Sequence, residues 1–374
     1  GPALVIVPTP EVIARAGALD ALATLRQLQG ARVLLVSDPG LVAAGHVDRA
    51  RALLEATARE VRTHTEVHPE PTSDDVQACL AAAQGADALV ALGGGSVLDV
   101  AKLAALMTPG ERVADHLGVH DTERSDTALV LVPTTAGTGS DGQAAAIVRD
   151  GATLRKMACL APGLGGDVVL LDAALTVSCP RGVTAAAGLD TLTHAVEVAV
   201  TTRRNARSDA LATRAFVAAQ GALTRVLAAP GDLSAREAML RAAHDAGQAI
   251  AHSMLGAAHA AGNALTARYG LAHGLAVGAM LPAVVRHNAR DPQTAARYAA
   301  LADAAGLGAS AEALIERLDA LLDLAGGSAA LVAPADIDGL AAEAASQWTG
   351  TFNPRPMDEA AYRALFEAVA GGSR

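Results

Sequence analysis

The chain has 374 residues, enough for two domains with separate hydrophobic cores. Hydrophobic residues make up 51% and aromatic residues only 2%, so Ala, Leu and Val must form most of the interior. The net charge of −10, without a basic cluster, excludes nucleic acid and anionic membrane surfaces as expected partners. No apolar run reaches the roughly 20 residues of a membrane span.

The cysteines and the first residues bear on where the protein works. Cys79, Cys159 and Cys179 are odd in number and lack metal-type spacing, which favours buried thiols. Gly1 and Pro2 resemble a remnant of protease cleavage, and no charged segment precedes an apolar stretch as in a secretory signal. We therefore expect a soluble protein of the reducing cytoplasm.

The first half of the chain alternates β-branched runs with helical segments. Strands are predicted at 31–38, 60–67, 86–93, 127–134 and 168–176. Helices are predicted at 47–60, from Ser73 to near Gly85, and from Ser96. Such alternation is typical of a parallel sheet with helices on both faces.

From about Thr184 the pattern changes to long Ala-rich helices with few strand signals. The sequence therefore predicts an α/β domain with a parallel sheet over residues 1–180. An all-α domain is predicted over residues 181–374.

A glycine-rich turn follows the apolar strand at 86–93 and opens the next helix. Glycine lets the backbone approach a phosphate closely, and a helix N-terminus offers free amide donors and a positive dipole end. An isolated turn of this composition is more often only a turn, whereas the strand–turn–helix context favours a phosphate site. The turn consists of Gly93, Gly94, Gly95 and Ser96.

Lysine is rare in this chain: of 29 basic residues, only Lys102 and Lys156 are lysines. Such a bias indicates that these two positions need a compact ammonium group where a planar guanidinium does not fit. The alternative is that the two lysines are present by chance. Asp99 and Lys102 lie three apart on the helix after the glycine turn, close enough for either to reach a bound cofactor.

Asp38 ends the first predicted strand and precedes Pro-Gly. An acid at this position can accept both hydroxyls of an adenosine ribose and repel a 2′-phosphate, which favours NAD over NADP. An ordinary turn residue is the alternative interpretation. A second loop, PTTAGTGSD at 133–141, also follows a strand and suits hydroxyl and amide contacts with a ribose or nicotinamide.

One carboxylate and three imidazoles have spacings compatible with a single metal site. Asp190 and His194 are four apart and project from one face of a predicted helix. His259 and His273 are fourteen apart, so the chain must fold back between them. This donor set favours Fe(II) or Zn(II) over Mg(II) or Ca(II), but the spacing alone does not exclude coincidence.

Together these strings resemble the iron-dependent, or group III, alcohol dehydrogenase family over nearly the whole chain. The matching strings, in order, are PEPTSDDV (69–76), GGGSVLDVAK (93–102), PTTAGTGSD (133–141), RKM (155–157), GLDTLTHAVE (188–197), HGLAVGAMLP (273–282) and NPRP (353–356).

The resemblance implies an N-terminal dinucleotide-binding α/β domain and a C-terminal helical domain, with NAD(H) and Fe(II) or Zn(II) meeting in the cleft between them. It implies hydride transfer between the nicotinamide and a carbonyl or carbinol carbon, with the metal acting as a Lewis acid. The implied metal ligands are Asp190, His194, His259 and His273. The implied cofactor contacts are Asp38, Gly93, Gly94, Gly95, Ser96, Asp99, Thr134, Thr135, Thr138 and Lys156.

Three positions depart from the family pattern on the substrate side. Asn263 stands four residues after the third ligand, where relatives usually have a proton-relaying His, and His252 is a candidate replacement relay. Arg268 replaces an apolar residue and either clamps an anion or faces solvent. If His252 and Arg268 face the cleft, the substrate is a small anionic aldehyde, for example a phosphonoacetaldehyde-like compound.

The leading hypothesis is thus a metal- and NAD(H)-dependent alcohol dehydrogenase or aldehyde reductase acting on a small aldehyde or primary alcohol. We expect it to form a homo-oligomer, specifically a dimer. Maleylacetate reductase-like and glycerol dehydrogenase-like enzymes are alternatives within the family. A dehydroquinate-synthase-like NAD-dependent cyclase and a catalytically silent NAD-binding protein are alternatives from other classes.

Overall fold

The computed structural model describes residues 3–327 and 332–372, so Gly1 and Pro2 lie outside the described residues. The described chain divides into two compact units, Ala3–Cys179 and a second unit that begins at Pro180. Among the described helices, none has the length and apolar character needed to cross a membrane.

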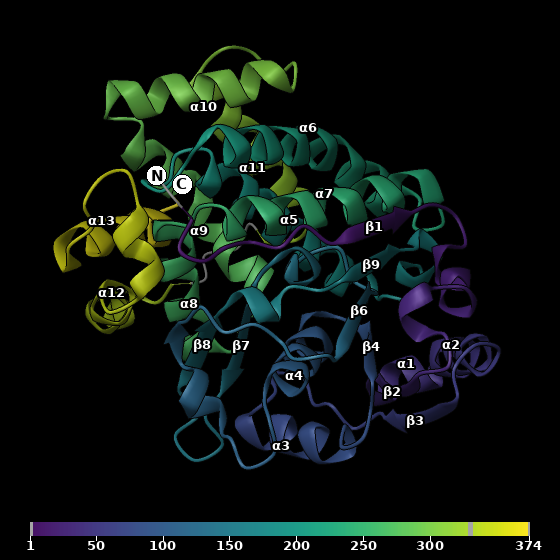
Figure 1. The fold of residues 1–374 in the computed structure, drawn as a ribbon. Helices are drawn as coiled ribbons and strands as arrows, with labels where there is room; N and C mark the ends of the chain where they lie inside the picture. Colours follow the sequence, from purple (N-terminus) through teal and green to yellow (C-terminus); the bar gives the residue numbers. More distant parts are fainter. Residues whose placement is uncertain (1–2, 328–331, 373–374) are drawn as a thin grey trace. The chain divides into compact units, whose positions relative to one another are not determined.

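The first unit is built on a six-stranded sheet in which every neighbouring pair is parallel (Figure 1). All six residues of β4 are buried, as expected for a strand covered on both faces. The predicted parallel sheet is therefore confirmed. In the spatial order β1-β9-β6-β4-β2-β3, the strands are Glu11–Ala14, Val168–Leu171, Ala128–Pro133, Ala88–Gly93, Arg32–Val36 and Glu60–His64.

The α-helices of this unit are the three that were predicted and one short additional helix, α1, and side chains cap the N-termini of α1 and α3. Thr72 is the N-cap of α3 and forms a capping box with Asp75, so the helix begins at Ser73, as predicted. The α-helices are α1 (Pro39–Ala43), α2 (His46–Glu55), α3 (Ser73–Ala82) and α4 (Gly95–Leu106). The 3₁₀ helices are η1 (Ala18–Ala23), η2 (Arg26–Leu28), η3 (Val113–His116), η4 (Ser140–Gly142), η5 (Pro162–Leu164) and η6 (Ala173–Thr176).

Several features of this unit differ from the sequence prediction. The helix predicted at 47–60 ends at Glu55, and the strand predicted at 60–67 ends at His64. The strand predicted at 168–176 ends at Leu171, because the Asp172 side chain accepts a hydrogen bond from the Ala174 amide and caps η6. Strand β1 was not predicted. A second sheet, also unpredicted, pairs β8 (Lys156–Leu160) with β7 (Ala145–Arg149) and β5 (Gly118–Val119).

The second unit is helical, and its central element is α5 (Arg181–Val198). Every residue of α5 from Gly188 to Val198 is buried, because the helix packs against α6, α7 and α9. The other helices are α6 (Ala206–Ala228), α7 (Leu233–Ala251), α8 (Ala257–Tyr269), α9 (His273–Asn288), α10 (Pro292–Ala304), α11 (Ala311–Leu324), η7 (Pro334–Asp336), α12 (Ile337–Ala345), η8 (Trp348–Phe352) and α13 (Glu359–Ala370).

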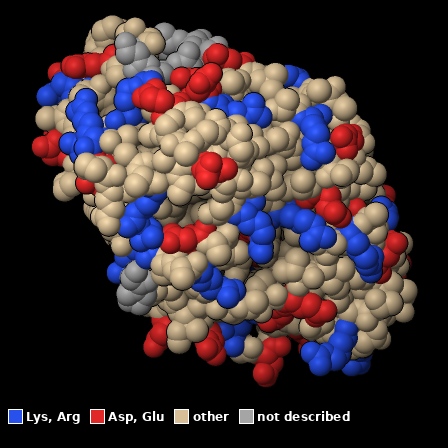
Figure 2. All heavy atoms as spheres, turned by 90° about the horizontal axis from the view of Figure 1, so that it is seen from above, with Lys and Arg blue, Asp and Glu red and all other residues tan. Residues whose placement is uncertain are grey.

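The surface mixes both signs of charge. Figure 2 shows Lys and Arg side chains interspersed with Asp and Glu over the face that it presents. Some of the described ion pairs are well exposed, for example Arg49 with Asp20. Exposed pairs of this kind contribute little to stability, so the buried Ala, Leu and Val side chains must supply most of it.

Candidate metal and cofactor sites

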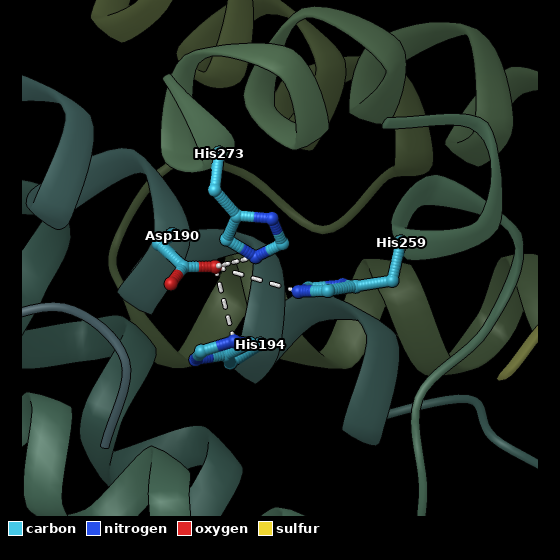
Figure 3. Close-up of side chains that lie close together, drawn as sticks. All are labelled: Asp190, His194, His259 and His273. Carbon is cyan, nitrogen blue, oxygen red and sulfur yellow. Dashed lines mark ion pairs between the residues drawn. The ribbon is translucent and has the colours of Figure 1, made fainter. Parts of the chain in front are cut away.

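Four side chains from three helices converge in the second unit (Figure 3). Asp190 and His194 lie four apart on α5 and project from the same face, as their spacing predicts. His259 is in the first turn of α8, and His273 is the first residue of α9. The chain reversal between α8 and α9 brings the last two together.

The distances in this cluster match a four-coordinate metal. Asp190 Oδ1 lies 3.0 Å from His194 Nε2, 3.4 Å from His259 Nε2 and 3.3 Å from His273 Nε2. The four ligand atoms all lie within 4.8 Å of one another. Ligands about 2.1 Å from a tetrahedral centre are about 3.4 Å apart, so an ion fits among these atoms.

Two candidate ligand atoms of the cluster lack hydrogen-bond partners, as expected where a metal ion binds. Asp190 Oδ1 and His259 Nε2 are buried and have no hydrogen-bond partner among the described residues. Buried polar atoms without a partner are costly and rare in folded proteins. One carboxylate oxygen and three imidazole nitrogens are ligands suited to Fe(II) or Zn(II).

Electrostatics of the cluster favour a bound cation. Burial acts to raise the pKa of Asp190, but the adjacent charges of His194 and His273 hold this pKa well below its usual range. Burial lowers the pKa of His194, although the Asp190 carboxylate acts to raise it. For His259, the carboxylates of Glu197 and Asp190 outweigh burial and raise the pKa to about 9. A divalent cation would displace that proton, because metal ligands bind deprotonated.

Two glycines let the three helices approach closely enough to form the cluster. A Cβ at Gly274 would lie 1.8 Å from the carbonyl oxygen of Ala186, so α9 meets α5 there without room for a side chain. A Cβ at Gly262 would lie 2.8 Å from the backbone nitrogen of Val277, which brings α8 against α9. These contacts place His259 and His273 beside Asp190 and His194 of α5.

The predicted nucleotide loops lie at one edge of the parallel sheet in the first unit. Asp38 follows β2, Gly93 ends β4, and the loop 133–141 follows β6, and these three strands are adjacent and parallel. After β2 the chain adds β3 on one side and β4 on the other, so β2 and β4 form a topological switch point. Ligands of open α/β sheets bind outside the carboxyl ends of strands at such points.

The two glycine and threonine loops contact each other. A Cβ at Gly94 would lie 3.3 Å from Thr135 Oγ1, and one at Gly95 would lie 2.7 Å from Thr138 Oγ1. The Thr134 amide donates to the Gly93 carbonyl oxygen at 3.0 Å. The glycines therefore serve the close packing of the loops as well as the expected approach of a phosphate.

Lys102 is buried inside the protein, although its position on α4 suggested that it could reach a bound cofactor. Its ammonium is fully buried and donates to Ser140 O at 2.5 Å, Ser140 Oγ at 2.9 Å and Ala145 O at 2.8 Å. Asp99 accepts from Ser140 Oγ at 2.6 Å and from the Ile147 amide at 3.1 Å. Burial lowers the pKa of Lys102 to about 8 against the opposing charge of Asp99. All three donors are used within the protein, which favours a role in shaping the loop 133–141 over direct contact with a cofactor.

Comparison with known proteins identifies the family. Residues 8–173 match the family model described as iron-containing alcohol dehydrogenase. Residues 184–370 match the C-terminal model of the Fe-containing alcohol dehydrogenase family. The chain belongs to the iron-containing alcohol dehydrogenase family. This membership confirms the predicted class, a metal- and NAD(H)-dependent alcohol dehydrogenase or aldehyde reductase.

Individual members of the family are similar over most of their length. Alcohol dehydrogenase 4 of Schizosaccharomyces pombe is 32% identical over 293 residues, covering 77% of this chain and 69% of the relative. Sulfoacetaldehyde reductase of Bilophila wadsworthia is 30% identical over 283 residues, covering 75% and 72%. The structure of an iron-containing alcohol dehydrogenase from Thermococcus thioreducens superposes with a TM-score of 0.87 at 27% identity, covering 97% and 98%.

The candidate substrate residues His252 and Arg268 make their side-chain contacts outside the four-residue cluster. His252 caps the C-terminal end of α7, and its Nε2 accepts from Arg207 Nε at 3.0 Å. Arg268 forms a 2.7 Å ion pair with Asp336 and its side chain is 60% exposed, which favours the solvent-facing alternative over the anion clamp. Neither residue forms a hydrogen bond or ion pair with the cluster among the described residues.

Asn263 and Lys156 complete the set of predicted residues. Asn263 lies one turn after His259 on α8, and its amide nitrogen donates to Gln347 Oε1 at 3.2 Å. Lys156 begins β8 in the small sheet, where it is exposed. The roles of both residues stay predictions.

One buried residue that contacts the cluster was missed from the sequence. Glu197 is buried on α5, and its Oε2 lies 2.6 Å from His259 Nδ1. It stands seven residues after Asp190 and three after His194, on the helix face that carries both of these side chains. That spacing is the sequence signal from which Glu197 could have been identified.

Proposed function

We propose that this chain catalyses hydride transfer between NAD(H) and a small aldehyde or primary alcohol at a divalent metal held by Asp190, His194, His259 and His273. The observation that carries the proposal is the convergence of three imidazole nitrogens on one buried carboxylate oxygen at 3.0–3.4 Å. Iron or zinc suits this ligand set.

The chain's own residues bind and orient the reactants. When bound, the metal supplies a Lewis acid and NAD(H) supplies the hydride. We assign the cofactor's pyrophosphate to the amides of the turn 93–96 at the start of α4, and its adenosine ribose to Asp38. Asp99, Lys102, Thr134, Thr135, Thr138 and Lys156 are the remaining proposed contributors to the cofactor site.

A neutral small aldehyde or alcohol is the substrate class that we favour. The guanidinium of Arg268 is already matched by the carboxylate of Asp336, so the anion clamp has no support from its contacts. An anionic aldehyde is the second candidate, because the Bilophila wadsworthia relative is a sulfoacetaldehyde reductase. Asn263 does not titrate, so we assign it a hydrogen-bonding role and no proton transfer.

A homodimer in the cytoplasm is also part of the proposal. The dimer rests on the family resemblance alone. The cytoplasmic location is supported by three free cysteines, of which Cys79 and Cys159 are buried and Cys179 is partly buried.

Turnover by the reconstituted enzyme tests the proposed function. The protein is stripped of metal, reloaded anaerobically with Fe(II) or Zn(II), and assayed for NADH oxidation with neutral, carboxylate, sulfonate and phosphonate aldehydes. We expect metal-dependent NADH consumption with neutral aldehydes, and a loss of at least about a hundredfold in kcat/KM for Asp190→Asn, since metal ligands cannot be replaced without loss.

Arg268→Leu is the matched variant outside the cluster. We expect it to change turnover of neutral and anionic aldehydes by the same factor, because Arg268 pairs with Asp336. A selective loss on anionic aldehydes would instead favour the second candidate. Metal-loaded protein that consumes no NADH with any aldehyde would contradict the proposal, and a cyclase would give this result because it returns its NAD unchanged.

A further inference from the structure

Glu197 is a buried carboxylate that no step of the proposed reaction uses. It lies on α5 with Asp190 and His194, and its side chain is 3% exposed. An ionised carboxylate buried this deeply is costly unless donors satisfy both of its oxygens. The groups that donate hydrogen bonds to Glu197 therefore indicate its role.

One oxygen of Glu197 fixes the ring of His259. Oε2 lies 2.6 Å from His259 Nδ1, a short distance typical of a charge-assisted hydrogen bond. A carboxylate only accepts, so Nδ1 must carry the proton. The other ring nitrogen, Nε2, points to Asp190 Oδ1 at 3.4 Å and has no hydrogen-bond partner. The contact thus selects the tautomer whose free nitrogen faces the cluster.

The second oxygen of Glu197 holds the start of the helix that carries His259. Oε1 accepts from the Ala258 amide at 2.5 Å and from the His259 amide at 3.2 Å. The residue at the N-cap of α8, Gly256, has no side chain to make these bonds. A negative charge at a helix N-terminus is also favourable. Glu197 on α5 therefore forms hydrogen bonds with both the backbone and the ring of His259.

We propose that Glu197 is a positioning residue that presents His259 to the metal. Through it, α5 supplies two ligands directly and sets the orientation and tautomer of a third. The inference rests on the proposed function, because it requires that the four-residue cluster holds a divalent cation.

Glu197→Gln is the direct test, because it keeps the size of the side chain and removes one acceptor. Whichever way the carboxamide turns, its NH₂ group faces either His259 Nδ1 or the amides of Ala258 and His259. We expect the Kd for Zn(II), measured by competition with a chromophoric chelator, to rise about 10- to 100-fold, the usual effect of losing such a partner. The visible spectrum of the Co(II)-loaded variant should change with it.

Asp172→Asn is the matched control. Asp172 is also a fully buried carboxylate that accepts two backbone amides, those of Leu19 and Ala174, but it contacts no residue of the cluster. We expect it to lower the thermal midpoint and leave the Kd for Zn(II) unchanged. If Glu197 only capped α8, Glu197→Gln would behave like this control, and that result would overturn the proposal.

The outcomes separate this inference from the proposed function. A wild-type protein that binds no Zn(II) would refute the metal site itself, whereas equal affinity of wild type and Glu197→Gln would refute only the role of Glu197. Should the variant not fold, ¹⁵N-histidine NMR of the Zn(II)-loaded wild type decides the matter. A proton on Nδ1 of His259, shifted far downfield, is expected, and an unprotonated Nδ1 would overturn the proposal.

Discussion

Asp38 has two carboxylate oxygens, and the structure uses one of them to begin a helix. Oδ1 accepts from the Leu41 amide at 2.9 Å and caps α1. Oδ2 has no hydrogen bond or ion pair within the described part of the chain. The two interpretations of Asp38 from the sequence, a turn residue and a ribose acceptor, are therefore compatible in a single side chain.

Asp38→Ser separates these two roles. Serine keeps the helix cap but removes the negative charge that would repel a 2′-phosphate. We expect the ratio of kcat/KM for NADPH to that for NADH to rise by tenfold or more, on the order of 1.4 kcal/mol, with little change in the thermal midpoint.

Asp38→Ala is the companion variant. It should shift the cofactor preference equally and in addition cost about 1 kcal/mol of stability, because the cap is lost. An unchanged cofactor ratio in both variants would show that Asp38 acts only as a cap.

At the residue scale, spacing along the chain predicts some roles and conceals others. Asp190 and His194 were identified because both lie on one helix, where a separation of four residues has a fixed geometric meaning. For Lys102, the sequence predicts a place beside the glycine turn but not its hydrogen-bond partners Ser140 and Ala145, which lie 38 and 43 residues away. Such contacts depend on tertiary packing and leave no local pattern.

At the scale of elements, the cluster depends on how closely α5, α8 and α9 approach. Gly274 immediately follows the candidate ligand His273, and a side chain there would overlap the Ala186 carbonyl oxygen. The backbone of α5 is the obstacle, so a substitution must displace the start of α9. The position of His273 would move with it.

Gly274→Ala should therefore impair stability and metal binding together. Overpacking of this kind typically costs about 1–3 kcal/mol in the free energy of unfolding. We also expect the Kd for Zn(II) to rise at least about tenfold, because a displaced ligand no longer completes the site. Urea denaturation of the metal-free protein and chelator competition measure the two effects.

Gly221→Ala is the control, since Gly221 lies inside α6 and a Cβ added there would have no atom within 4 Å. It should leave metal binding unchanged and stabilise the fold by roughly 0.5–1 kcal/mol, because alanine is the better helix former. A Gly274→Ala protein with wild-type stability and affinity would show that α9 adjusts without consequence.

The elements that could be predicted are those with long or strongly patterned sequences. The apolar runs of β2, β4 and β6 identify buried parallel strands, and the Ala-rich periodicity identifies the helices. Strand β5 has two residues and β1 has four, too few for a period to emerge. The end of β9 depends on the cap formed by Asp172, a side-chain choice that an apolar run does not reveal.

At the scale of the whole molecule, each unit carries one of the two candidate sites. The unit Ala3–Cys179 holds the loops at the carboxyl ends of parallel strands, and the unit that begins at Pro180 holds the candidate metal ligands. The change from alternating strands to Ala-rich helices was the basis for the predicted division near residue 180. The convergence of ligands from residue 190 to residue 273 was implied by the family resemblance, while the glycine contacts that produce it appear only in the structure.

Anomalous diffraction at the zinc or iron edge, from crystals of the metal-reconstituted enzyme, tests the central claim most directly. We expect a single strong peak about 2.0–2.2 Å from Asp190 Oδ1 and from the Nε2 atoms of His194, His259 and His273. A peak elsewhere in the molecule, or no peak at this cluster in fully loaded protein, would contradict the account.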